Sequence, residues 1–92
     1  MTDILHRSLA ASEDIVESPV GDETIILHLK NGIYFGLDPM GTRIWTLLKQ
    51  GMGPLEICER LSTEYSIARE TIETDVREFM DNLQANDILI DL

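Results

Sequence analysis

Three side chains of the types that bind metals or attack substrates stand out in the sequence, namely His6, His28 and Cys58. A metal site needs histidine, cysteine or carboxylate ligands at short, regular spacings, and these three residues lie far apart along the chain. The spacing therefore gives no indication of a metal site. Cys58 and His28 could in principle form a nucleophile and its base, which would require an exposed cysteine with a lowered pKa.

The surroundings of these residues argue against such chemistry. Cys58 shares a predicted helical face with Leu55 and Leu61, where a cysteine is expected to be buried as a small hydrophobe. His28 follows a strand pattern and is expected on an open sheet face, as a solvated or pairing side chain. The segment Asn31–Gly36 has two glycines but lacks the helix start that a phosphate-binding loop needs. We therefore predict no catalytic residue, metal or cofactor, and no enzymatic activity.

Composition limits the possible partners. The chain has 92 residues, with 7 lysines and arginines against 17 aspartates and glutamates, and a net charge of −10. Because nucleic acids attract proteins mainly through basic side chains, free nucleic acid is not an expected partner. No apolar run approaches the roughly 20 residues that span a bilayer, so no membrane partner is expected. A chain without a secretory signal and with one cysteine fits a reducing cytoplasm, which is the predicted location.

The first part of the chain carries strand and turn signals. A short strand is predicted around Asp14–Ser18, followed by a turn at Ser18–Asp22. The β-branched segment Glu23–Lys30 predicts a second strand. Asn31–Gly32 then predicts a two-residue hairpin turn of type I′, since both residue types tolerate positive φ, and Ile33–Leu37 returns as a third strand.

The second part carries helix signals. Asp38 is a suitable N-cap and Pro39 suits the first helical turn, so a helix is expected from this point to Gly51. A second helix is expected to begin at Pro54, and a third is expected from about Arg69 to Asn86.

The order of strands followed by helices predicts an α+β fold. We expect a winged-helix-like domain in which a three-stranded antiparallel sheet is followed by a three-helix bundle. This single domain is expected over residues 13–92, after a flexible N-terminal arm at residues 1–12. The end of the chain is expected to be an extended tail that packs Ile88 and Ile90.

Strand alternation sorts the side chains of the predicted hairpin onto two faces. A two-residue turn would place Leu29 opposite Tyr34 and His28 opposite Phe35. One face, expected to be the core, would then hold Ile25, Leu27, Leu29 and Tyr34. The other face would hold Ile26, His28, Lys30, Ile33, Phe35 and Leu37. The apolar residues of the last strand on this second face would need a cover that the hairpin does not supply.

The strand Ile33–Leu37 comes last in the predicted meander and is therefore expected at a sheet edge. An edge strand offers unpaired N–H and C=O groups, to which an extended peptide can add. The third helix would be the second wall of a groove beside this edge. Two interpretations stay open: the helix covers the apolar residues as ordinary core, or strand and helix together bind a peptide.

Three segments, in this order and spacing, resemble the PqqD-like family, whose members are known as RiPP recognition elements. They are the L-x-x-G-x-Y-x-x-L hairpin from Leu29, the G-x-x-I-W-x-L-L helix from Gly41 and the D-V-x-x-F-x-x-x-L helix from Asp75. The resemblance covers about Ser12 to Leu92. It implies a small domain that binds the leader segment of a ribosomally made precursor peptide. The leader would add as a strand to the third strand and pack against the third helix.

Carried onto this sequence, the resemblance implies a non-catalytic peptide chaperone that delivers a precursor to its modifying enzymes. The sequence style is closer to lasso-peptide partners, which implies a leader protease and a cyclase, whereas a quinone-cofactor pathway would imply a radical SAM enzyme. The implied peptide-binding residues are Ile33, Tyr34, Phe35, Gly36 and Leu37 on the strand, and Asp75, Val76, Glu78, Phe79, Asn82 and Leu83 on the helix. Of these, Val76, Phe79 and Leu83 are open to a core role instead, and the acids would meet basic leader residues.

Two alternatives remain from the sequence, a winged-helix transcription regulator and a protein-interaction scaffold without a peptide ligand. A DNA-binding regulator would place base-reading residues on its recognition helix, but residues 69–79 carry two arginines against four acids. DNA binding would require a single patch made by the basic residues Arg43, Lys49, Arg60, Arg69 and Arg77.

Overall fold

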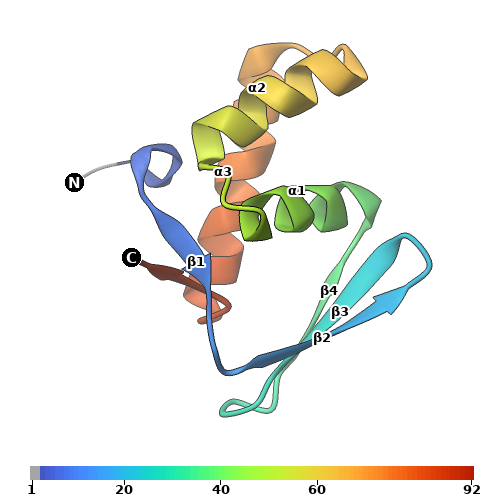
Figure 1. The fold of residues 1–92 in the computed structure, drawn as a ribbon, viewed down its shortest axis with the longest axis vertical. Coiled ribbons are helices and arrows are strands. Elements are labelled where there is room, and N and C mark those ends of the chain that lie inside the picture. Colours follow the sequence, from blue (N-terminus) through green and yellow to red (C-terminus); the bar gives the residue numbers. More distant parts are fainter. Residues whose placement is uncertain (1–2) are drawn as a thin grey trace.

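The computed structural model describes residues 3–92, in which a three-stranded sheet is followed by three helices (Figure 1). The strands are β2 (Ile15–Val20), β3 (Glu23–His28) and β4 (Tyr34–Leu37), antiparallel in the spatial order β2-β3-β4. A small second sheet pairs β1 (Leu9–Ala11) with β5 (Leu89–Asp91). The predicted α+β architecture is thus confirmed, with the second sheet as an addition.

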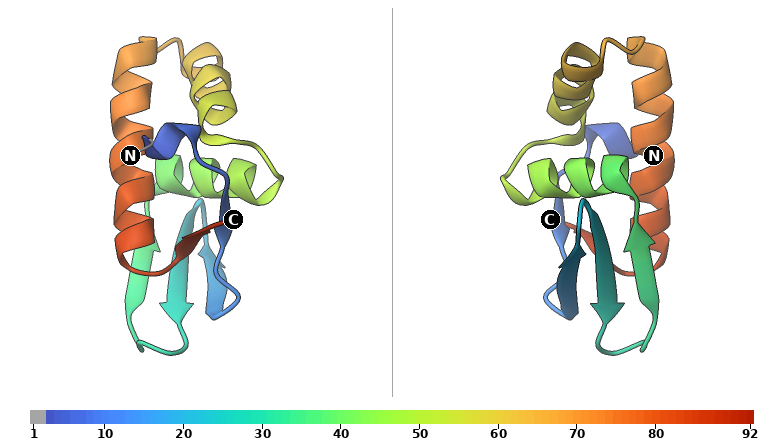
Figure 2. Two further views of the ribbon diagram at one scale, coloured as in Figure 1. Left: turned by 90° about the vertical axis from the view of Figure 1, so that its left-hand side faces the viewer. Right: turned by 90° about the vertical axis from the view of Figure 1, so that its right-hand side faces the viewer.

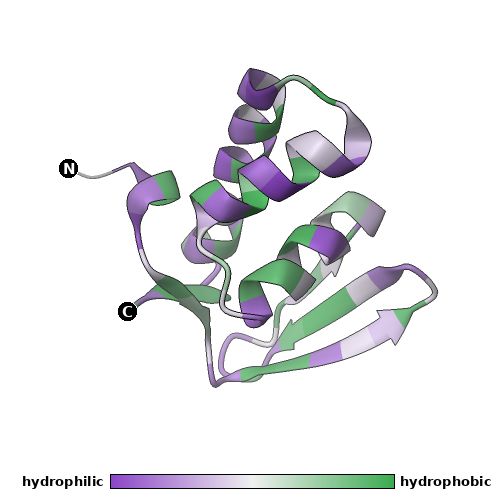
Figure 3. Ribbon diagram, turned by 45° about the horizontal axis from the view of Figure 1, so that its top comes forward, coloured by the Kyte–Doolittle hydropathy of each residue, from purple (hydrophilic) through white to green (hydrophobic). Residues whose placement is uncertain are grey.

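The helices are α1 (Pro39–Lys49), α2 (Pro54–Tyr65) and α3 (Arg69–Ala85). Asp38 caps α1 as predicted, because its side chain accepts a hydrogen bond of 2.7 Å from the Gly41 N–H. Hydrophobic and hydrophilic positions alternate around α2 and α3, so each helix turns one apolar side to the core (Figure 3). None of the helices in residues 3–92 is long and apolar enough to cross a membrane.

The core lies between the helices and one face of the sheet. Trp45 of α1 is 1% exposed, and its indole Nε1–H donates to the Glu17 carboxylate of β2 over 2.8 Å. The same carboxylate oxygen accepts from Lys49 over 2.7 Å, so one strand residue holds two side chains of α1. Ile26 of β3 and Leu37 of β4 are buried beneath this helix. These contacts fix α1 across the sheet.

The predicted core face of the sheet is the wrong one. The buried residues of the hairpin are Thr24, Ile26, His28 and Leu37, whereas Tyr34 is 70% exposed and Leu29 is 58% exposed. The alternation groups the residues as predicted, but the helices cover the other group. The reason is that the chain turns directly from Leu37 into α1, and the direction of this turn decides which face is covered. Strand periodicity carries no information on that direction.

The hairpin turn also differs from the prediction. Leu27 pairs with Tyr34, and the loop spans Leu29–Gly32 rather than two residues. Gly32 has a φ of 69°, but Asn31 does not have the positive φ that a type I′ turn requires. The Asn31 N–H instead donates to Nδ1 of His28 over 3.3 Å. His28 was expected on an open face, but it is 4% exposed and its ring closes the turn.

The predicted turn at Ser18–Asp22 is shorter in the structure. Ser18, Pro19 and Val20 belong to β2, and only Gly21 and Asp22 form the turn. Gly21 has a φ of 65°, which suits glycine at this position.

The N-terminal segment is packed where a flexible arm was expected at residues 1–12. Ile4–His6 form a short 3₁₀ helix, η1, in which Ile4 and Leu5 are buried. Asp3 caps η1 and accepts from Arg77 of α3 over 3.0 Å, and this guanidinium holds the pKa of the Asp3 carboxyl below its usual range. Residues 1 and 2 of the expected arm lie outside the described residues. Burial of η1 against α2 and α3 extends the domain beyond the predicted start at residue 13.

The C-terminal tail forms β5 and packs beside α3. Ile88 is buried as predicted, but Ile90 is 43% exposed and Leu89 is buried in its place. Pairing with β1 turns alternate residues of the tail outward, which explains the exchange.

Candidate functional site

The β4 strand lies at an edge of the three-stranded sheet, as predicted. The His28 N–H donates to the Ile33 carbonyl over 3.0 Å, so this pair faces across the β3–β4 ladder. Hydrogen-bonded and non-hydrogen-bonded pairs alternate along an antiparallel ladder, and the bonded pairs therefore include Ile26 with Phe35. The N–H and C=O groups of Tyr34 and Gly36 then point away from β3, toward the free edge.

The two edges of the sheet differ in a way that bears on binding. At the β2 edge, the same alternation points the backbone nitrogen of Pro19 outward, since the Leu29 N–H bonds to the Asp14 carbonyl over 2.8 Å. A proline at this position has no N–H to offer and blocks the addition of another strand. The β4 edge contains no proline. Of the two edges of this sheet, the β4 edge is therefore the more open to strand addition.

A groove runs between this edge and α3. Its first part is a cavity of about 210 Å³ next to β4, lined by Phe35, Gly36, Leu37, Asp38, Phe79 and Asn82. Its second part, of about 460 Å³, is lined by Asp38, Met40, Gly41, Ile44, Asp75, Glu78, Phe79 and Asn82. The two parts share Asp38, Phe79 and Asn82, so they form one continuous surface, which we call the β4–α3 groove. Figure 2 shows α3 standing beside β4 in both views.

Phe79 forms the floor of this groove and depends on a glycine in α1. A Cβ added at Gly41 would lie 2.9 Å from Cε1 of Phe79 and 3.1 Å from the Asp38 carboxylate. Gly41 therefore leaves room for the Phe79 ring close to the α1 backbone. Sequence reasoning missed Asp38, Met40, Gly41 and Ile44 as lining residues. The available signal was a glycine in the first turn of a helix, where it costs stability unless another group packs closely.

The groove has a negative rim. Asp75, Glu78 and Asp38 line it, and no basic side chain does. Within residues 3–92 none of the three forms a salt bridge, and the Asp38 carboxylate is used as the α1 cap. A ligand of this groove would meet apolar walls and a rim that favours positive charge.

The structure brings most of the predicted site residues together. The residues of the prediction that line the groove are Phe35, Gly36, Leu37, Asp75, Glu78, Phe79 and Asn82. Tyr34 reaches the edge through its backbone, because its side chain pairs with Leu27 on the outer face. Ile33 lies just before β4 and is 47% exposed. Val76 and Leu83 are fully buried in the core, which was the alternative left open for them.

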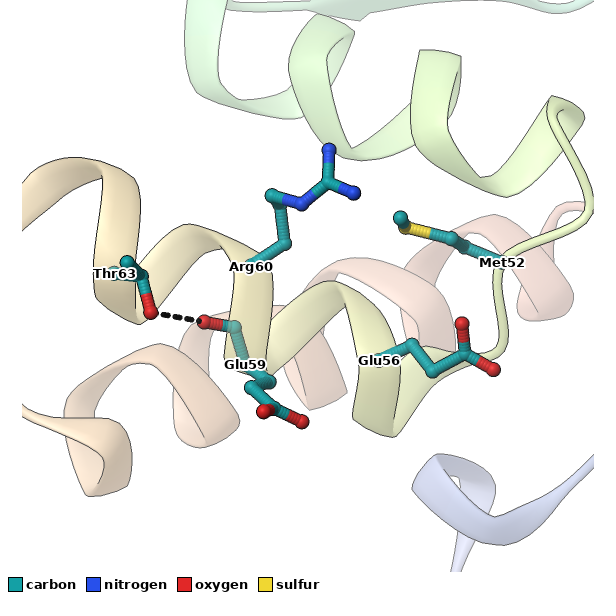
Figure 4. A pocket seen from close by; sticks show the side chains of 5 residues that line it. All are labelled: Met52, Glu56, Glu59, Arg60 and Thr63. Carbon is teal, nitrogen blue, oxygen red and sulfur yellow. Dashed lines mark hydrogen bonds between the residues drawn. The ribbon is translucent and has the colours of Figure 1, made fainter.

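The basic residues that DNA binding would need do not form a free patch. Arg43 pairs with Glu64, Lys49 with Glu17, Arg69 with Glu73, and Arg77 with Asp3. Arg60 lines a cavity of about 320 Å³ at α2 together with Met52, Glu56, Glu59 and Thr63, and its guanidinium points away from the Glu56 and Glu59 carboxylates (Figure 4). This cavity holds none of the predicted site residues. The acids that accompany the basic side chains offset the positive charge that phosphates require.

Cys58 is buried in the core, as predicted, and is 0% exposed. Burial raises the pKa of its thiol, which disfavours the reactive thiolate. Across residues 3–92, no group of three or more histidine, cysteine or carboxylate side chains could hold a metal ion. The structure thus gives Cys58 the role of a core side chain.

Cys58 is therefore expected to resist alkylation in the folded protein. Iodoacetamide at pH 7.5 should modify it at least 100-fold more slowly than in the urea-unfolded chain, because labelling requires exposure of the thiol and its conversion to the thiolate. Mass spectrometry after timed quenching measures both rates, with free cysteine as the reference. Labelling of the folded protein at the unfolded rate would contradict the burial of Cys58.

Comparisons with known proteins agree with this geometry. Residues 23–89 match the family model described as coenzyme PQQ synthesis protein D (PqqD). The structure of "TbiB1 in Complex with the TbiA(beta) Leader Peptide" is similar, with 43% identity and a TM-score of 0.82 over 86% of this chain and 92% of that one. "Lasso peptide synthetase B1 complexed with the leader peptide" shares the fold at 20% identity, with a TM-score of 0.83 over 90% of this chain and 98% of that one.

No curated protein sequence matches the chain. The family model covers well over half of the chain, and its span includes the hairpin, the three helices and both walls of the β4–α3 groove. The TbiB1 structure supports the same assignment at an identity that is well above the level of shared fold alone. The chain belongs to the PqqD family.

Proposed function

We propose that this protein binds the leader segment of a ribosomally synthesised precursor peptide as a fourth strand on β4. The observation that carries the proposal is the free β4 edge beside the β4–α3 groove. TbiB1, which shares 43% identity and the same fold, was solved with a leader peptide. The structure of a second leader-peptide complex has the same fold.

Affinity and specificity would come from different parts of this site. The backbone groups of Tyr34 and Gly36 would exchange hydrogen bonds with the leader, each contributing about 0.5–1.5 kcal/mol. These bonds depend little on leader sequence. Alternate leader side chains would point into the groove, where Phe35, Leu37 and Phe79 form apolar walls. Shape and polarity there would select the leader.

The rim of the groove adds an electrostatic preference. Asp75 and Glu78 stand on consecutive turns of α3 beside Phe79, and no basic side chain of the described chain neutralises them. A leader with lysine or arginine at the matching position would gain an ion pair with one of these carboxylates. Such ion pairs would also raise the rate at which leader and protein associate at low ionic strength.

The biological role would be to hold the precursor peptide by its leader while other enzymes act on it. A leader bound to this protein keeps the rest of the precursor at a high effective concentration near any enzyme that also binds the protein. One of the two leader-peptide complexes with this fold is that of a lasso peptide synthetase B1, which favours a leader protease and a cyclase as these enzymes over a radical SAM enzyme. In this role the protein is a non-catalytic adaptor, and it acts in the cytoplasm, where the precursor is made.

Strand addition predicts an alternating pattern of amide protection. The probe is the TbiA(beta) leader peptide, added to uniformly ¹⁵N-labelled protein. The amides of Tyr34 and Gly36 should gain at least tenfold protection from hydrogen exchange, because they face the free edge. The amides of Phe35 and Leu37 already face β3 and should change much less. A scrambled peptide of the same composition is the control.

The outcomes separate clearly. Protection at Tyr34 and Gly36 together with chemical shift changes around Phe79 supports strand addition with α3 as the second wall. Shift changes confined to α3 would replace strand addition by a helix-only contact. A saturating amount of the leader without any change in the protein spectrum would refute leader binding.

A further inference from the structure

The N-terminal segment Asp3–Ala11, which we call the N-terminal clasp, is held against α3. At its start, the Asp3 carboxylate accepts from Arg77 in the middle of α3 over 3.0 Å. Ile4 and Leu5 are each 2% exposed and belong to the core, where η1 packs against α2 and α3. In the left-hand view of Figure 2, η1 lies between these two helices. The clasp thus contacts α3 through an ion pair and through buried apolar side chains.

The end of the clasp is joined to the strand that follows α3. β1 pairs with β5, and beyond the strands the Leu92 N–H donates to the Ser8 carbonyl over 2.9 Å. The Asp91 carboxylate accepts from Gln84 of α3 over 2.9 Å and forms an ion pair with Arg7 of the clasp over 3.4 Å. One carboxylate therefore links the clasp to the last turns of α3.

The polar contacts of the clasp lie on the face of α3 opposite the β4–α3 groove. A helix advances by about 100° per residue, so Arg77 stands about 200° from both Asp75 and Phe79, which line the groove. Gln84 follows Arg77 by about two turns and therefore shares its face. In addition, α3 approaches α2, η1 and β5 more closely than it approaches α1 or β4. The second wall of the groove is thus held from behind rather than across the groove.

We propose that the N-terminal clasp positions α3 for leader binding, with Arg77 as a positioning residue, an inference that rests on the proposed function. A leader whose backbone is bonded to β4 can pack on Phe79 only if α3 stands at a fixed distance from that strand. Holding α3 in place before the leader arrives lowers the entropy that binding must remove. The family model matches residues 23–89, so the clasp lies outside the matched span. Releasing it should weaken leader binding without changing any residue that lines the groove.

This coupling must act in both directions, because a clasp that favours leader binding is itself stabilised by the leader. The N–H groups of His6 and Arg7 donate to the carbonyls of Asp3 and Ile4 within η1, over 2.9 and 3.1 Å. These two amides should gain at least threefold protection from hydrogen exchange when the TbiA(beta) leader peptide is saturating. Unchanged exchange of both amides at saturation would show that the clasp and the groove are not coupled.

Substitutions at Arg77 test the ion pair. Arg77→Gln removes the pair and should lower the affinity for the TbiA(beta) leader about three- to fivefold, the upper range for a partly exposed ion pair. Arg77→Lys can still pair with Asp3 and should bind within twofold of the original. Arg69→Gln is the matched control, because it removes the same charge and the 2.9 Å ion pair with Glu73 from the same helix. It should also bind within twofold. Isothermal titration calorimetry measures all four affinities.

Leu5→Ala tests the apolar part of the clasp. Leu47→Ala is its control, since Leu47 is 1% exposed in α1 and lies outside both the clasp and the lining of the groove. Leader affinity should fall at least tenfold for Leu5→Ala and less than threefold for Leu47→Ala. Circular dichroism and urea unfolding verify that both variants fold and measure how far each one is destabilised.

The outcomes separate the clasp from leader binding itself. Unchanged leader affinity in folded Arg77→Gln and Leu5→Ala would overturn the inference and leave the proposed function standing. Equal losses in Leu5→Ala and Leu47→Ala would also overturn it, because general destabilisation would then explain both. If Leu5→Ala does not fold, the three arginine variants decide, since they change partly exposed side chains. Absence of leader binding in the unmodified protein would instead refute the proposed function.

Discussion

Replacing Gly36 by proline is expected to weaken leader binding by roughly ten- to a hundredfold and to leave the domain folded. The Gly36 N–H points to the free edge, so a proline there removes a donor to the leader but none to β3. Losing one hydrogen bond and leaving the leader carbonyl unsatisfied costs about 1–3 kcal/mol. The proline ring also occupies space where the added strand would lie. Isothermal titration calorimetry with the leader peptide measures the change.

Gly36→Ala is the matched control. An added Cβ at Gly36 meets nothing within 4 Å, and alanine keeps the N–H, so this variant should bind the leader within about threefold of the original. Circular dichroism and thermal melting verify that both variants fold. Equal leader affinity for Gly36→Pro and Gly36→Ala would contradict strand addition at this edge.

Replacing Trp45 by alanine is expected to cause the largest loss of stability of any single truncation in the core. Trp45 is the largest fully buried side chain, and it joins α1 to β2 through its hydrogen bond with Glu17. Truncation of a buried tryptophan to alanine costs about 3–5 kcal/mol, whereas small domains have only about 5–15 kcal/mol of total stability. The melting temperature should fall by at least ten degrees, on the order of 4–8 °C for each kcal/mol.

Trp45→Phe separates packing from hydrogen bonding in this test. Phenylalanine keeps most of the buried volume but cannot donate to Glu17, which retains its contact with Lys49. Trp45→Phe should lower the free energy of unfolding by about half as much as Trp45→Ala or less, since most of the loss comes from the buried volume that is removed. Urea unfolding followed by circular dichroism gives both free energies. A loss below 1 kcal/mol for Trp45→Ala would show that α1 is not anchored through this residue.

The helices were predictable because their signals are local. Asp38 with Pro39 marks the start of α1, and the spacing of Ile72, Val76 and Met80 marks one face of α3. Each signal lies within a few residues of the structure that it determines. The same holds for the burial of Cys58, which shares a helical face with apolar neighbours.

The candidate site was predictable in part, through the family resemblance more than through periodicity. The resemblance placed a groove between β4 and α3, and seven of its residues line that groove in the structure. It also named Val76 and Leu83, which the helix turns into the core. Met40 and Gly41 were missed because they come from α1, which enters the groove only after the chain has folded back over the sheet.

The sequence by itself determined the order of β2–β4 and the three helices, the cap of α1 and the two-faced alternation of the hairpin, because these depend on neighbouring residues along the chain. Only the tertiary structure decided which face of the sheet is covered. The path from Leu37 into α1 buries Ile26 and His28 and leaves Tyr34 and Ile25 in solvent, the reverse of the prediction. Both choices satisfy the same period-two pattern. The choice depends on packing between residues distant in the chain, and it creates the β4–α3 groove on the covered side of the sheet.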